Sequence, residues 1–288
     1  MIKYINNNVE ERSIKHLSQM DVKDKVKLAV SLMRSVNSVR SYTMAFSGGK
    51  DSVVMEWMAT EAGIKVPKVY NNTTIDPEGT ISFVLKHGCT IQRNKLSFLD
   101  LVEKKGLPTM FRRFCCKELK EKYIADYLFV GVRRDESVKR TAAYSCFEDT
   151  YTYSKKVSTS RFFPLLFFTD EDIAYVVNKY DLEMHPLYYD HNHKFCVNRR
   201  LGCIGCPLQS DRGRIDFLRY PKLLKLIIER AVKFHENHGR TRHDAYLNVV
   251  YNLFYSNHGY EKYAQAYEGL FDVDPKETLE EYFLFNLP

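Results

Sequence analysis

Between residues 41 and 62, an apolar strand pattern, a glycine-rich loop and a helical pattern follow one another without a break. The strand is predicted over 41–46, the loop is Ser47-Gly48-Gly49-Lys50-Asp51-Ser52, and the helix is predicted over 52–62. Adjacent glycines let the backbone turn tightly and approach a bound group, and the amides at a helix start carry partial positive charge. The sequence therefore predicts an anion site where a strand of an α/β sheet meets its helix.

The side chains of this loop favour phosphate. Ser47 and Ser52 offer hydroxyl groups, and Lys50 can neutralise phosphate charge. The spacing is not that of a Walker A loop, in which Ser or Thr follows Gly-Lys, because Asp51 stands there. We predict a nucleotide-phosphate site of another class. The alternative is a Ser/Gly-rich turn that only joins a strand to a helix.

Short apolar strands alternate with helical patterns along the following residues. This alternation predicts the α/β class, with a parallel twisted sheet, helices on both faces and a helical C-terminal extension. The further strands are predicted at 68–71, 89–93, 128–132 and 162–166. The further helices are predicted at 21–36, 77–87, 98–105, 115–127, 173–180 and 221–235.

Three regions follow from this pattern. Residues 1–38 are predicted to form an N-terminal arm and a helix, and residues 39–210 a nucleotide-binding α/β domain that also carries the metal-ligating cysteines. Residues 211–288 are rich in Tyr and Phe and predict a helical extension packed on that domain rather than an independent module.

Four of the seven cysteines form a pattern typical of metal ligands. Cys115 and Cys116 are adjacent, and after 86 further residues Cys203 and Cys206 form a C-x-x-C pair followed by proline. Thiolates two residues apart can face one metal centre from a tight turn. Four such soft ligands suit a 4Fe-4S cluster or Zn²⁺.

Other interpretations of the cysteines stay open. Cys196 with His191 or His193 could complete a zinc site with the C-x-x-C pair, and the thiols could simply be buried in the core. We interpret Cys89 and Cys146 as incidental, because the first lies in a predicted strand and the second in a predicted loop.

With these motifs in order, the chain over about residues 40–235 resembles the phosphoadenosine phosphosulfate reductase family of the adenine nucleotide α-hydrolase superfamily. Its loop matches that superfamily's S-G-G-x-D-S pyrophosphate loop. Residues 131–140 are similar to the family's G-x-R-x-x-E-S-x-x-R stretch, and residues 72–77 to the segment after its second strand. Residues 164–173 and 186–188 resemble later family motifs, although Phe167-Phe168 replaces the usual Trp position.

The resemblance implies ATP, Mg²⁺ and a 4Fe-4S cluster as cofactors. The cysteine pattern is similar to that of bacterial adenylylsulfate reductases and of the DNA phosphorothioation ATP pyrophosphatase. It implies these site residues: Ser47, Gly48, Gly49, Lys50, Asp51, Ser52 and Thr73 for the nucleotide; Lys50, Asp51, Arg133, Glu136 and Arg140 for catalysis; Cys115, Cys116, Cys203 and Cys206 for the cluster. For the Arg and Glu residues, a purely structural salt bridge is the alternative.

The reaction expected from the resemblance is adenylation. A reductase of this family needs a nucleophilic cysteine on its C-terminal tail, and no cysteine follows Cys206 in this sequence. We therefore predict an ATP pyrophosphatase or adenylyl transferase that activates an acceptor for sulfur incorporation, with a cysteine desulfurase as candidate sulfur donor. Adenylylsulfate or phosphoadenylylsulfate reduction is the alternative, and a non-catalytic nucleotide-binding Fe-S subunit or sensor is a second one.

The distribution of charge favours a polyanionic partner. Lys and Arg number 43 against 36 Asp and Glu, and residues 104–161 contain fourteen basic and seven acidic residues. Such a stretch favours nucleotide phosphates or a nucleic acid, DNA or RNA, although a solvated charged surface is the simpler alternative. We expect Lys155, Lys156 and Arg161 to contact the acceptor, with DNA phosphorothioation as the leading case.

The sequence predicts a cytoplasmic protein without membrane contact. No apolar run reaches the roughly 20 residues needed to cross a bilayer, and the first residues lack the apolar stretch of a secretory signal. Cysteines in such a chain are expected to be reduced thiols or metal ligands rather than a disulfide framework.

Overall fold

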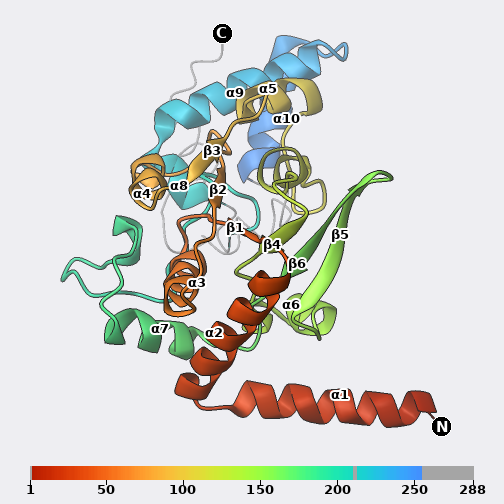
Figure 1. Ribbon diagram of the computed structural model, residues 1–288. Helices are drawn as coiled ribbons and strands as arrows, with labels where there is room; N and C mark the ends of the chain where they lie inside the picture. Colours follow the sequence, from red (N-terminus) through yellow and green to blue (C-terminus); the bar gives the residue numbers. More distant parts are fainter. Residues whose placement is uncertain (1, 210–212, 255–288) are drawn as a thin grey trace, which may run out of the picture. The chain divides into compact units, whose positions relative to one another are not determined.

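The computed structural model describes residues 2–209 and 213–254, and its internal contacts divide the chain into two units (Figure 1). The first unit combines Met1–Asn72, Asp76–Arg93 and Glu121–Gly202. The second combines Thr73–Ile75, Asn94–Lys120 and the chain from Cys203 onward. This division differs from the predicted 39–210 domain, because it groups 94–120 and the C-x-x-C turn with the later helices.

A six-stranded sheet forms the centre of the first unit, in the order β3-β2-β1-β4-β6-β5. All neighbouring strands are parallel except β5 and β6, which form an antiparallel hairpin at one edge. The strands are β1 Thr43–Ala45, β2 Lys68–Asn71, β3 Thr90–Gln92, β4 Tyr127–Phe129, β5 Glu148–Ser154 and β6 Val157–Phe162. The predicted α/β class with a parallel sheet is confirmed.

Helices of the first unit pack on this sheet through one large apolar core. Helix α3 (Lys50–Glu61) starts directly at the glycine-rich loop and contacts both α2 (Val22–Val39) and α7 (Asp170–Lys179). Thr169 and Asp172 form a capping box at the start of α7. The other helical segments are α1 Ile2–Gln19, α4 Thr80–Lys86, η2 Arg134–Glu136, α6 Val138–Ala143 and η3 Pro186–Tyr188.

Two predicted elements are wrong. Strand β6 ends at Phe162, where a strand was predicted to begin, and 163–168 forms turns whose apolar side chains are buried. The apolar run reflects burial, which a strand and a buried turn share. In place of the helix predicted over 115–127, only a short π-helical turn forms, η1 Cys116–Lys120.

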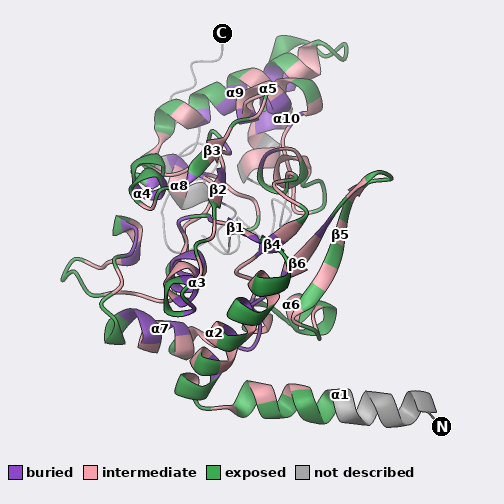
Figure 2. Ribbon diagram, viewed as in Figure 1, coloured by how far each residue is buried: buried purple, intermediate pink, exposed green. Residues whose placement is uncertain are grey.

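The second unit is helical. Helix α5 (Phe98–Lys105) packs on α9 (Pro221–Glu236), which also packs on α10 (Arg242–Phe254). Figure 2 shows buried positions recurring along α9, and these are Leu224, Ile227, Ile228, Ala231 and Val232. Their spacing of three and four residues places one apolar stripe against the unit's core. The short helix α8 (Arg214–Arg219) precedes α9.

The predicted helical extension is confirmed over α8, α9 and α10, and the rest of the predicted 211–288 region lies outside the described residues. In the part of the chain that the structure describes, no helix has both the length and the apolar character required to cross a membrane.

Candidate nucleotide site

The loop between β1 and α3 has a backbone that requires glycine at its first glycine position. Gly48 has a φ of 74°, in the left-handed region that side chains rarely adopt. A methyl group added there would also lie 3.3 Å from side-chain carbons of Leu201 and Val84. The hydroxyl oxygen of Ser47 accepts a hydrogen bond from the amide of Gly49 at 3.3 Å. The loop is therefore held in one tight conformation.

Tyr188 fixes the start of helix α3. Its hydroxyl oxygen accepts hydrogen bonds from the amide of Lys50 at 3.0 Å and from the amide of Leu201 at 3.3 Å. Burial raises the pKa of Tyr188, so the hydroxyl stays protonated. The Lys50 amide therefore already has a partner, which leaves fewer free amides at this helix start than the motif alone suggests.

The Lys50 side chain is buried in the first unit, although the sequence suggested that it faces a ligand. Lys50 is 5% exposed, and its Nζ lies 3.6 Å from Oδ1 of Asp170, the first residue of α7. Ser52 is buried as well, and its hydroxyl donates to the carbonyl oxygen of Gly49 at 2.7 Å. The ammonium group of Lys50 is thus paired with the carboxylate of Asp170.

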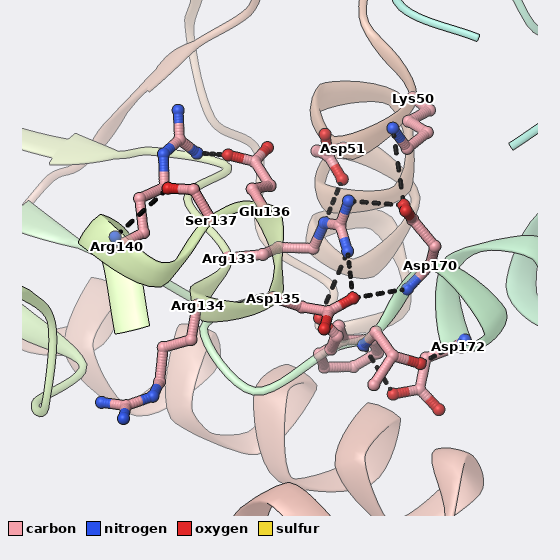
Figure 3. A network of polar contacts seen from close by, with 12 residues as sticks. Lys50, Asp51, Arg133, Arg134, Asp135, Glu136, Ser137, Arg140, Asp170 and Asp172 are labelled. Atoms are coloured by element: carbon pink, nitrogen blue, oxygen red, sulfur yellow. Dashed lines mark hydrogen bonds and ion pairs between the residues drawn. The ribbon is translucent and has the colours of Figure 1, made fainter. Parts of the chain in front are cut away.

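Arg133 binds the carboxylate of Asp170 and also that of Asp51 (Figure 3). It is 1% exposed, and its Nε donates to Oδ1 of Asp51 at 2.6 Å while its Nη2 donates to Oδ1 of Asp170 at 2.7 Å. Its Nη1 donates to the carbonyl oxygen of Phe168 at 3.3 Å and lies 3.8 Å from Oδ2 of Asp135. A buried guanidinium of this kind fixes the carboxylates around it.

These contacts change the interpretation of Arg133. The resemblance implies that Arg133 touches reacting phosphate, whereas its guanidinium is enclosed by protein acceptors. Direct contact with phosphate would require Arg133 to leave Asp51 or Asp170. The geometry instead indicates that Arg133 links the loop to α7, because its guanidinium binds Asp51 of the loop and Asp170 of α7.

Gly131, the first residue of the motif at 131–140, lies close to Asp51 of the loop. A methyl group added there would lie 3.2 Å from Cβ of Asp51 and 3.4 Å from its carbonyl carbon. The first of these contacts is tighter than most, so that a side chain at this position would require Asp51 to shift by a few tenths of an ångström. The glycine therefore lets the chain after β4 lie against the first turn of α3.

Glu136 and Arg140 form an ion pair four residues apart at the start of α6. The hydroxyl of Ser137 caps that helix by accepting from the amide of Arg140 at 3.3 Å. Burial lowers the pKa of Arg140, and the positive charges of Arg200 and Arg133 act in the same direction. Tyr144 and the negative charge of Asp51 act in the opposite direction, so Arg140 lies within electrostatic range of a carboxylate as well as of Arg200.

Thr73 belongs to the second unit, not to the unit that holds the loop. It is buried, and its hydroxyl oxygen accepts a hydrogen bond from Sγ of Cys203 at 3.5 Å. Two residues further on, the carbonyl oxygen of Ile75 accepts from the amide of Ile204 at 2.8 Å. The structure places Thr73 beside the cysteine turn, and its contact with a nucleotide stays a prediction.

The four predicted cluster ligands all lie in the second unit. A hydrogen bond with Cys116 raises the pKa of the Cys115 thiol, and burial and the nearby thiols of Cys116, Cys203 and Cys206 raise it further. Burial also raises the pKa of Cys206. The four sulfur atoms therefore lie within electrostatic range of one another, so that ionising one thiol is opposed by the others.

Hydrogen bonds from Gly205 and Gln209 hold the C-x-x-C turn in place. Gly205 has a φ of 66° within it, and its amide donates to Oδ2 of Asp216 at 3.0 Å. The side-chain Nε2 of Gln209 donates to the carbonyl oxygen of Cys203 at 3.2 Å and to Oδ2 of Asp216 at 2.9 Å. Across the described ranges, 2–209 and 213–254, no three His, Cys, Asp or Glu side chains are arranged to hold a metal ion. The metal stays a prediction.

The remaining cysteines are in the first unit. Cys89 is buried, and burial raises the pKa of its thiol to about 12, which makes it a poor nucleophile or ligand. Cys146 is exposed. Cys196, the ligand of the alternative zinc site, donates instead to the carbonyl oxygen of Lys194 at 3.5 Å.

Comparisons with known proteins agree with the motif order. The phosphoadenosine phosphosulfate reductase domain model matches residues 41–209. The uncharacterized protein MJ0973 of Methanocaldococcus jannaschii is 28% identical over 209 residues, which cover 66% of this chain and 47% of that protein. The chain thus spans about half the length of this curated relative.

Two solved structures are similar at low identity. The phosphoadenylyl-sulfate reductase of Candida auris, a phosphate complex, matches with a TM-score of 0.41 and 11% identity over 62% of this chain and 88% of that one. The FMN adenylyltransferase of Candida glabrata, with FAD and inorganic pyrophosphate, matches with a TM-score of 0.39 and 12% identity over 63% and 67%. The family match covers more than half of the sequence, and the chain belongs to the phosphoadenosine phosphosulfate reductase domain family.

Proposed function

We propose that the first unit binds ATP through the β1–α3 loop and releases pyrophosphate while it transfers the adenylyl group to an acceptor. The observation that carries this proposal is the buried network in which Asp170 holds Lys50 and Arg133 holds both Asp51 and Asp170. Lys50 lies beside the glycine-rich start of a helix and is paired with the carboxylate of Asp170. Its ammonium group can exchange this carboxylate for a phosphate group.

In this account Lys50 leaves Asp170 and neutralises the departing pyrophosphate. Arg133 keeps Asp51 and Asp170 in place during the exchange, since it bonds to both. Arg140 and Arg200 lie within electrostatic range of each other, and the phosphate charge would attract both. Preorganised charge of this kind lowers the cost of the negative charge that develops on the leaving phosphate.

The carboxylates also fit Mg²⁺. Among the described residues, Oδ2 of Asp51 and Oδ2 of Asp170 accept no hydrogen bond. Mg²⁺ in nucleotide sites takes one or two carboxylates together with substrate phosphates and water. When bound, the ion supplies charge neutralisation at the phosphates. Asp51 and Asp170 are the residues that would hold it.

For the second unit, the proposal is a 4Fe-4S cluster on Cys115, Cys116, Cys203 and Cys206. Support comes from the type of donor, because four thiols are the soft ligands that such a cluster takes and their pKa values show that they lie within electrostatic range of one another. A bound cluster would supply one-electron chemistry or a structural link. Zn²⁺ is the alternative occupant of the same thiols.

For the acceptor, the proposal is a nucleic acid, with DNA phosphorothioation as the specific case and a cysteine desulfurase as sulfur donor. Support comes from Lys155 and Lys156, which are exposed at the turn between β5 and β6. Arg161 does not support it, because Asp149 binds its guanidinium through Nε at 2.8 Å and Nη2 at 2.5 Å.

Product analysis tests the reaction. ATP labelled in its α-phosphate is incubated with anaerobically purified protein, with and without DNA or RNA. We expect pyrophosphate and an adenylylated acceptor or AMP. Formation of ADP and phosphate would contradict the proposed reaction. Pyrophosphate release that does not depend on any nucleic acid would contradict the proposed acceptor.

Sulfonucleotide reduction is the second candidate, since the matched family model is named for it. Sulfite formed from adenylylsulfate or its 3'-phosphate with an external thiol, without pyrophosphate release from ATP, would favour the reductase. ATP binding without either product would favour a nucleotide-binding sensor or complex subunit.

A further inference from the structure

The second unit contains a cavity that no step of the proposed adenylation uses. Its volume is about 370 Å³, within the range of small-molecule pockets. Residues from the start of α5, from the loop after it and from α8, α9 and α10 line the cavity, and they include the aromatic rings of Phe98, Phe217 and Phe234. A site of this size and lining suits a small ligand with an apolar body.

One wall of the cavity is polar and carries only positive or neutral groups. Arg112, His235, Asn248 and Asn252 line it, and no Asp or Glu is among its lining residues in the described chain. Burial lowers the pKa of His235, and the positive charges of Arg240, His238 and Arg112 act in the same direction. Among the described lining residues Arg112 carries the formal charge, and this positive charge would favour an anion.

Arg112 is the donor positioned for such an anion. Its Nη2 donates to the carbonyl oxygens of Lys105 at 2.6 Å and Leu107 at 3.1 Å, which holds the guanidinium against the loop after α5. Within the described residues, its Nε and Nη1 have no acceptor. A fixed guanidinium with unused N–H groups beside an apolar cavity matches a carboxylate on an apolar body.

We propose that this cavity binds a small amphipathic carboxylate, with its apolar or aromatic body among the phenylalanine rings and its carboxylate on Arg112. Gly205 and Pro207 of the cysteine turn line the same cavity, so a bound ligand would contact the segment that carries Cys206. The residues that line the cavity belong to the second unit, whereas the nucleotide loop belongs to the first.

Displacement of a fluorescent amphipathic anion, 8-anilinonaphthalene-1-sulfonate, tests the site in the full chain. We expect one dye site and displacement by phenylacetate at a concentration at least tenfold lower than by neutral phenylacetamide. Equal displacement by the two would overturn the proposal. Phenyl phosphate displacing the dye while phenylacetate does not would overturn the carboxylate assignment.

Two variants locate the site. Arg112→Gln should weaken dye and phenylacetate binding about tenfold, whereas Arg113→Gln, one position along on the exposed loop, should leave both unchanged. Asn248→Trp should fill the cavity and abolish displacement by phenylacetate. Equal binding by both arginine variants, or unchanged displacement in the Trp variant, would contradict the proposal. The comparison of phenylacetate with phenylacetamide on the unmodified chain needs no variant to fold.

Discussion

At the scale of single residues, Arg133 has the clearest energetic role. Its side chain is enclosed and bonds to Asp51, Asp170 and the Phe168 carbonyl. Removing one member of a buried ionic network leaves uncompensated charge behind, which costs about 3–5 kcal/mol. Arg133→Met should therefore lower the free energy of unfolding by about that amount in urea denaturation.

Arg93 provides the control for this prediction. It is exposed, and the described structure shows no hydrogen bond or ion pair for it, so Arg93→Met should change stability by less than about 0.5 kcal/mol. If Arg133→Met unfolds at the same urea concentration as the unmodified chain, the contacts of Arg133 with Asp51 and Asp170 do not stabilise the fold.

Sequence motifs identified part of this network. Lys50, Asp51 and Arg133 lie within local patterns, and the structure brings them together around Asp170. In the sequence, Asp170 and Tyr188 were noted only as members of the segments that resemble later family motifs. Their roles were missed because each meets the loop across more than a hundred residues, and no local periodicity encodes such a contact.

At the scale of elements, the turn η3 that presents Tyr188 to the loop depends on a buried histidine. Nδ1 of His185 accepts from the amide of Leu187 at 3.2 Å, so this nitrogen must stay unprotonated. Burial lowers the pKa of His185 below its ordinary value of 6.5. The unfolded chain therefore takes up a proton at a higher pH than the folded chain does.

Stability contributed by His185 is fully present above pH 6.5 and is lost as the pH falls toward its folded pKa, by up to about 1.4 kcal/mol per pH unit. His185→Asn keeps a cap acceptor but does not titrate. The stability advantage of the unmodified chain over this variant should shrink between pH 6.5 and 5 in urea unfolding. Parallel pH profiles for the two proteins would show that His185 does not titrate on unfolding.

The cysteine turn gives a second prediction at this scale. Cys203→Ser should remove the iron and acid-labile sulfide expected in anaerobically purified protein and should lower its melting temperature, because cluster ligands join distant segments. Cys146→Ser is the matched control, since Cys146 is exposed and lies in the other unit. Stoichiometric zinc without iron in the unmodified protein would show that the cluster assignment is wrong.

Element boundaries show what a local pattern can and cannot predict. Strands β1 and β2 and helices α3, α5 and α9 lie close to their predicted ranges, because each combines apolar periodicity with a glycine, proline or capping signal. The β5–β6 hairpin was missed. Burial alternates along β5 but not along β6, and the many Thr, Ser and Tyr residues of the two strands give only a weak apolar period in the sequence.

At the scale of the whole molecule, the basic excess between residues 104 and 161 divides into free and paired charges. Lys155 and Lys156 are exposed, whereas Arg161 is held by Asp149, and its pKa is raised by that pairing despite the opposing effect of burial. The expectation that all three contact the acceptor therefore narrows to the two lysines.

Lys155→Glu with Lys156→Glu should weaken DNA binding at low salt about equally for unrelated sequences, as expected for backbone contacts. It should also reduce the slope of log affinity against log salt, because fewer counterions are released. Lys27→Glu with Lys65→Glu, two exposed lysines elsewhere in the first unit, is the control. Equal loss in both double variants would indicate an unspecific effect of net charge.

We propose that the β1–α3 loop binds a nucleotide through its phosphates, with Lys50 exchanging Asp170 for phosphate. Calorimetric titration of ATP into the unmodified chain, Lys50→Met and the exposed-lysine control Lys65→Met tests this directly. A charge-assisted hydrogen bond contributes about 1.5–3 kcal/mol, so Lys50→Met should weaken ATP binding at least tenfold while Lys65→Met leaves it unchanged. Equal ATP affinity in all three folded proteins would contradict the claim.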